Sequence, residues 1–182
     1  AAVLRTTPGA TVLHNLICSR AVPETVREHG GVPVRTKVGH SYIKQVMAET
    51  GAVFGGEHSA HYYFAKNYRA DSGLIASVML IDELCRSGHD LSVLRKPFER
   101  YASSGEINTQ VADADAVIEA VSGEFAKHDQ DRLDGLTVDC GSWWFNLRPS
   151  NTEPLLRLNL EAATRDECDR HVAELLALIT RG

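Results

Sequence analysis

The run Thr11-Val12-Leu13-His14-Asn15-Leu16-Ile17 is short, apolar and partly β-branched, which is typical of a buried strand. Downstream of it we expect a helix over residues 23–29, a second strand over residues 32–35 and a helix over residues 41–50 with Ser41 as its N-cap. Val53 and Phe54 then form a third strand. This alternation of strands and helices predicts an α/β unit with a largely parallel sheet.

The rest of the chain predicts a second domain of another class. Residues 73–87 form a long helical pattern that is apolar on nearly all sides, as in a buried helix, and residues 91–98 form a short helix near the boundary. Strands are expected at residues 107–111, 136–140, 143–147 and 154–160, helices at residues 113–125 and after Thr164, and a turn at residues 128–134. We therefore predict a mostly parallel α/β/α-type domain (residues 1–92), followed by a smaller α+β domain with an antiparallel sheet (residues 93–182).

Composition narrows the class of protein. The chain has 182 residues, 43% of them hydrophobic, and a net charge of −5 with acidic and basic residues interleaved, which argues against nucleic acid as the main partner. No apolar run reaches membrane-spanning length, and the four cysteines lack Cys-x-x-Cys spacing, so we expect reduced thiols and a cytoplasmic location. The chain begins without a methionine and resembles a piece of something longer.

Polar residues follow each predicted strand of the first domain, where ligands of parallel sheets gather. They are Ser19-Arg20, then Lys37 with Gly39-His40, then the stretch Gly55-Gly56-Glu57-His58-Ser59-Ala60-His61-Tyr62-Tyr63-Phe64. Glu57 and Ser59 are two residues apart and share a direction in extended backbone, which suits a sugar; an ordinary hairpin tip is the alternative. His40 and His61 are candidates for proton transfer, although a single loop histidine is usually just solvated.

A second polar loop, Leu147-Arg148-Pro149-Ser150-Asn151-Thr152-Glu153-Pro154, lies between two predicted strands. A guanidinium with short hydroxyl and amide donors can hold phosphate oxygens, and a simple turn stabilised by its own side chains is the alternative. Arg157 fits the alternative better if it only pairs across the sheet. Acidic pairs in residues 113–115 and 129–131 fall at a helix start and in an exposed turn, so we assign no metal to them.

Together with Lys37-Val38-Gly39-His40-Ser41-Tyr42-Ile43-Lys44, these two loops resemble the α-D-phosphohexomutases, and most closely the phosphomannomutase/phosphoglucomutase branch. The resemblance covers essentially the whole chain and implies domains three and four of that family. The family moves a phosphoryl group between O6 and O1 of a hexose through a bisphosphorylated sugar. The resemblance implies that Glu57 and Ser59 contact sugar hydroxyls, His61 lies near the transferring proton, His40 and Lys37 line the site, and Arg148, Ser150, Asn151 and Thr152 hold phosphate.

Some features depart from the family pattern. Ala60 stands where glycine is usual, which is costly if its φ is positive, and Ile17 stands where a lysine is common. The phosphoserine loop and the Mg²⁺ loop of the first two domains do not occur in these residues. We therefore expect a C-terminal half that is inactive alone, missing domains one and two, with Mg²⁺ serving only the full-length enzyme and mannose or glucose 1- or 6-phosphate as substrates. The alternatives are a non-catalytic sugar-phosphate binding or regulatory module and a scaffold with vestigial loops.

Overall fold

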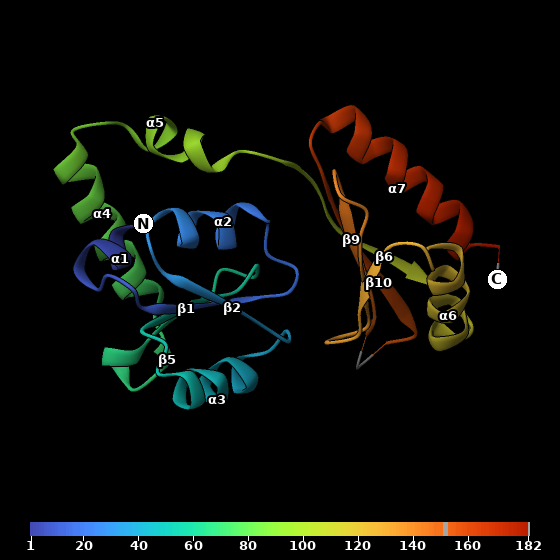
Figure 1. Ribbon diagram of the computed structural model, residues 1–182, viewed down its shortest axis with the longest axis horizontal. Coiled ribbons are helices and arrows are strands. Elements are labelled where there is room, and N and C mark those ends of the chain that lie inside the picture. Colours follow the sequence, from blue (N-terminus) through green and yellow to red (C-terminus); the bar gives the residue numbers. More distant parts are fainter. Residues whose placement is uncertain (151–152, 182) are drawn as a thin grey trace. The chain divides into compact units, whose positions relative to one another are not determined.

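The computed structural model describes residues 1–150 and 153–181 (Figure 1). The chain divides into two compact units, Ala1–Arg100 and Tyr101–Gly182. The division lies beyond the expected residue 92 because α5 (Leu91–Arg95) and the 3₁₀ helix η2 (Lys96–Phe98) belong to the first unit. Arg100 ties the end of this segment to α2 (Ala21–Glu28), with guanidinium nitrogens 3.0 Å from Glu24 and 2.6 Å from Glu28.

The first unit contains a sheet in the order β2-β1-β3-β4-β5. Its strands are β1 (Thr11–Asn15), β2 (Val32–Thr36), β3 (Phe54–Gly56), β4 (Tyr62–Phe64) and β5 (Ala70–Asp71). β1 runs parallel to β2 and β3, as predicted, whereas β4 and β5 add an antiparallel extension that the sequence pattern did not indicate. β1 ends at Asn15, before the predicted Ile17, because the Cys18 amide donates to the Asn15 carbonyl (3.1 Å) and turns the chain.

Helices cover both faces of this sheet, and Figure 1 shows α2 and α3 (His40–Thr50) on opposite sides of it. Ile43 of α3 packs with Leu13 and Tyr63, whereas Leu4 of α1 (Ala2–Thr6) and Val26 of α2 pack on Val12. The predicted α/β/α architecture is therefore confirmed. The prediction that Ser41 caps α3 is wrong, because the helix already begins at His40, after Gly39.

The prediction that the long apolar helix is buried is wrong. α4 (Gly73–Ser87) has no buried residue, and Leu74 is 77% exposed, Val78 58% and Ile81 57%. One side of the helix faces α1, where Glu83 pairs with Arg5, and the other side is open. The two faces of the sheet are already covered by other helices, so apolar composition alone did not place α4 in the core.

The second unit is built on an antiparallel sheet in the order β6-β10-β9-β8-β7. Its strands are β6 (Ala102–Gln110), β7 (Asp129–Asp131), β8 (Leu136–Asp139), β9 (Trp144–Pro149) and β10 (Leu155–Ala162), and its helices are α6 (Ala114–Glu124) and α7 (Arg165–Ile179). Buried leucines of β9 and β10 form one core cluster with both helices, which confirms the α+β prediction. Thr164 caps α7 as expected, its hydroxyl accepting from the Glu167 amide (3.3 Å). β7 occupies part of the predicted turn.

Within the described residues, no helix combines the length and the apolar character needed to cross a bilayer.

Candidate substrate site

The stretch Gly55–Phe64 forms a hairpin between β3 and β4. The Glu57 amide donates to the His61 carbonyl (2.9 Å), and the Ala60 amide donates to the Glu57 carbonyl (3.0 Å). Ala60 closes this tight turn with a φ of +64°. The strain anticipated for alanine in place of glycine is therefore present. The chain does turn as a hairpin tip here, and the polar residues lie on that tip.

Glu57 is buried and its carboxylate is the centre of the site. Oε1 accepts from the Tyr63 hydroxyl at 2.6 Å, and Oε2 accepts from the Gly39 amide at 3.1 Å and from Asn15 Nδ2 at 3.4 Å. These donors come from the end of β1, from the loop between β2 and α3, and from β4. The end of β1, the loop before α3 and the hairpin therefore meet at the Glu57 carboxylate.

Other predicted residues of the first unit lie on the surface around this carboxylate. Lys37, His40 and Ser59 are exposed; the Lys37 ammonium lies 5.7 Å from the centre of the Tyr42 ring, and His40 is the first residue of α3. Lys37 can supply a mobile positive charge and Ser59 a hydroxyl, as the sequence suggested.

His61 has a partner that the sequence did not reveal. Its Nδ1 lies 2.9 Å from Oδ2 of Asp71 on β5. The hydrogen bond from His61 lowers the pKa of Asp71 below its usual range, so this carboxylate is charged at neutral pH. A carboxylate on Nδ1 orients the imidazole and leaves Nε2 available to hold or move a proton.

Sequence reasoning missed Asn15 and Tyr63. Asn15 lies within the predicted apolar strand, and Tyr63 has no predicted role in the stretch Gly55–Phe64, yet both are completely buried and both donate to Glu57. A polar residue within an apolar run was the available signal for Asn15. No comparable signal existed for Tyr63, because its contact depends on the hairpin register.

The phosphate-cradle candidates of the second unit centre on two arginines. Arg148 on β9 and Arg157 on β10 are directly paired across the strands, and Glu106 of β6 forms an ion pair with each, 2.7 Å from Arg148 Nη2 and 3.5 Å from Arg157 Nη1. Arg157 Nη2 also donates to the Ser150 hydroxyl at 3.2 Å. Arg157 therefore does more than pair across the sheet. Asn151 and Thr152 lie outside the described residues.

The two guanidinium groups keep unused donors. Arg148 is 9% exposed, and the Nε atoms of Arg148 and Arg157 are buried without a hydrogen-bond partner among the residues that the structure describes. Each guanidinium group offers five N–H donors, of which the contacts with Glu106 and Ser150 use only part, so this pair is suited to an anion with several oxygens.

Magnesium has no ligand set in the described ranges, residues 1–150 and 153–181. No group of three or more His, Cys, Asp or Glu side chains there is arranged to hold a metal ion. The side chains present do not fit Mg²⁺, so no chemical step is assigned to it here.

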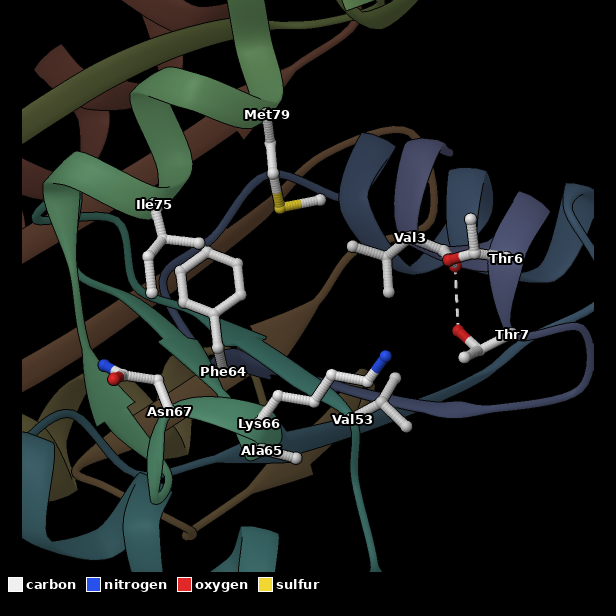
Figure 2. A pocket seen from close by; sticks show the side chains of 10 residues that line it. All are labelled: Val3, Thr6, Thr7, Val53, Phe64, Ala65, Lys66, Asn67, Ile75 and Met79. Carbon is white, nitrogen blue, oxygen red and sulfur yellow. Dashed lines mark hydrogen bonds between the residues drawn. The ribbon is translucent and has the colours of Figure 1, made fainter. Parts of the chain in front are cut away.

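An apolar pocket of about 370 Å³ lies elsewhere in the first unit, between α1, η1 (Ala65–Asn67) and α4. Figure 2 shows Ile75 and Met79 on one side of it, Val3 on the other, and Lys66 reaching across its base. Its lining contains none of the described residues predicted to bind substrate. This pocket is therefore separate from the candidate site.

Comparison with known proteins supports this division of the chain. The family model for the phosphoglucomutase/phosphomannomutase α/β/α domain III matches residues 1–101, and the model for the C-terminal domain of the same family matches residues 106–178. A phosphomannomutase of Methanocaldococcus jannaschii is 39% identical over 98% of this chain. A phosphohexose mutase of Xanthomonas campestris is 41% identical over 88% of it.

A solved structure shows the same fold. The phosphoglucomutase/phosphomannomutase family protein of Burkholderia thailandensis superimposes with a TM-score of 0.82 and 30% identity over 99% of this chain. The chain spans 40% of that protein, and 40% and 36% of the two relatives above. The matched domains and these relatives agree, and this chain belongs to the phosphoglucomutase/phosphomannomutase family.

Proposed function

We propose that this chain supplies the sugar- and phosphate-binding part of a phosphohexomutase. The reaction interconverts a hexose 6-phosphate and a hexose 1-phosphate, with mannose or glucose as the sugar, through a bisphosphorylated intermediate. The observation that carries the proposal is the pairing of the Arg148 and Arg157 guanidinium groups beside the Ser150 hydroxyl, which gathers several N–H and O–H donors at one place. A phosphate group supplies the acceptors that these donors need.

The two units take different parts of the substrate in this proposal. Arg148, Arg157 and Ser150 bind the phosphate that is not transferred, and Asn151 and Thr152 join them as the family resemblance implies. Glu57 accepts a hydrogen bond from a sugar hydroxyl. Ser59 and Lys37, which are exposed on the surface around Glu57, also bind the substrate. His61, oriented by Asp71, holds or accepts the proton of the reacting hydroxyl. His40, exposed at the start of α3, is the second residue proposed for proton transfer.

A phosphate cradle that can hold either end of the sugar explains how one site serves both phosphate positions. Phosphoryl transfer depends mainly on positioning and charge stabilisation, which are the properties that these residues supply. The phosphoryl donor and Mg²⁺ belong to the whole enzyme in this proposal, and no residue of this chain is assigned to them.

Isothermal titration calorimetry with mannose 1-phosphate and glucose 1-phosphate tests the cradle. We expect Arg148→Ala to abolish measurable phosphate-dependent binding, because charge-assisted, bidentate contacts to phosphate are lost. Arg148→Lys keeps the charge without the planar fork and should bind with intermediate affinity.

Arg165→Ala is the matched control, because Arg165 lies in the same unit and pairs with Asp169 on the surface of α7. Circular dichroism verifies that each variant is folded. Unchanged affinity in folded Arg148→Ala would contradict the proposed cradle.

A further inference from the structure

The protein itself uses most of the hydrogen-bonding capacity of the Glu57 carboxylate. An ionised carboxylate offers about four lone-pair positions. Oε2 has two donors, the Gly39 amide (3.1 Å) and Asn15 Nδ2 (3.4 Å), whereas Oε1 has one, the Tyr63 hydroxyl (2.6 Å). One acceptor position therefore remains, on Oε1.

Tyr63 is well suited to hold this carboxylate in place. Its ring is fully buried in the core with Ile43 and Leu13, so the position of the hydroxyl is fixed by packing. Burial, and then the hydrogen bond to Glu57, raise the pKa of Tyr63 far above its ordinary value, so the phenol keeps its proton and stays a donor. The short distance is typical of a hydroxyl donating to a charged acceptor.

Asn15 fixes the same loop from the other side. While its Nδ2 donates to Glu57, its Oδ1 accepts from the His58 amide at 3.4 Å and from the Cys18 thiol at 3.0 Å. Asn15 is completely buried. The Asn15 side chain therefore holds both the Glu57 carboxylate and the backbone amide of His58 in place.

We propose that Tyr63 and Asn15 are positioning residues that hold Glu57 in one orientation and leave it a single acceptor position, on Oε1, for one sugar hydroxyl. This inference rests on the proposed function. Glu57 then accepts a hydrogen bond from one sugar hydroxyl and does not bridge two, because Oε2 already accepts from Gly39 and Asn15.

Tyr63→Phe tests the inference, because it removes one hydroxyl and keeps the buried ring. The matched control is Tyr62→Phe: Tyr62 is the neighbouring residue, 37% exposed, and its ring stacks on Phe54. Asn15→Ala is the second variant. Calorimetry measures the affinity of each full 182-residue chain for mannose 1-phosphate and, separately, for inorganic phosphate.

We expect Tyr63→Phe and Asn15→Ala each to weaken mannose 1-phosphate binding roughly tenfold and to leave inorganic phosphate binding unchanged. Tyr62→Phe should change neither affinity. Because the proposed phosphate contacts lie in the second unit, urea unfolding of each variant is needed to detect damage to the first unit. If mannose 1-phosphate affinity falls only in variants whose first unit has lost its folded structure, the inference is overturned.

Two further outcomes separate this inference from the proposed function. Suppose that the unmodified chain binds mannose 1-phosphate more tightly than inorganic phosphate, and that Tyr63→Phe binds mannose 1-phosphate as tightly as the unmodified chain does. Only the positioning role is then overturned. If the unmodified chain does not discriminate between the two ligands, the sugar-reading role of Glu57 is overturned, and the positioning role with it.

Discussion

Replacing Ala60 with glycine measures the strain held in the hairpin of the candidate site. Ala60 has a φ of +64° and is exposed, so removal of its methyl group leaves no cavity. Left-handed backbone costs a non-glycine residue about 1–2 kcal/mol. Glycine loses about 0.5–1 kcal/mol more conformational entropy on folding than alanine does. The difference predicts that Ala60→Gly raises the free energy of unfolding by about 0.5–1 kcal/mol.

Urea unfolding followed by far-ultraviolet circular dichroism provides the measurement. Both tryptophans, Trp143 and Trp144, lie in the second unit, so tryptophan fluorescence reports on that unit and serves as an internal reference. For a first unit of this size, a gain near 1 kcal/mol corresponds to a rise of several degrees in the melting temperature.

The matched control is Ala48→Gly, an exposed position inside α3, where glycine should destabilise by about 1 kcal/mol. The two substitutions make the same chemical change and are expected to have opposite signs, because only one of the two alanines has a positive φ. If Ala60→Gly destabilised the protein as Ala48→Gly does, the conclusion that the turn is strained would be refuted.

Two further predictions concern pH and turnover. Burial lowers the pKa of His14 below its ordinary 6.5, so near this pH the unfolded chain binds a proton that the folded chain excludes. The free energy of unfolding should therefore fall as the pH drops below about 6.5. The expected slope is at most about 1.4 kcal/mol per pH unit, and the fall should stop once the pH is below the pKa of His14 in the folded chain. Urea unfolding at several pH values should show a smaller fall for His14→Phe, and an equal fall would assign the effect to other groups. The phosphoserine and Mg²⁺ motifs of the family do not occur in these 182 residues. We therefore expect no hexose 6-phosphate to form when the chain is incubated with Mg²⁺ and mannose 1-phosphate. Detection of hexose 6-phosphate in a coupled assay would refute the expectation that the chain is inactive alone.

Local pattern was sufficient for much of the fold. The alternation around β1 predicted the parallel core of the first unit, and the alternating leucines of β10 predicted the antiparallel sheet of the second. The hydroxyl of Thr164 marked the start of α7. These features depend on neighbours within a few residues, which is the range over which side-chain periodicity and capping act.

The environment of α4 and the ends of several elements did not follow from pattern. The helix is apolar on most sides, which predicted burial, yet Leu74 is 77% exposed. Periodicity reports which side chains are apolar, but only the packing of other helices on the sheet decides what covers them. The hairpin partner strand β4 was likewise missed, because its three residues are too few to show a period.

The sequence by itself determined which residues are candidates for the site: Glu57, Ser59 and His61 in one loop, and Arg148 and Ser150 in another. The tertiary structure alone decided their partners. Tyr63 and Asn15 meet Glu57, Asp71 meets His61, and Glu106 and Arg157 meet Arg148. These contacts join different strands and loops, so they depend on strand order and register, which no local pattern in the sequence specifies.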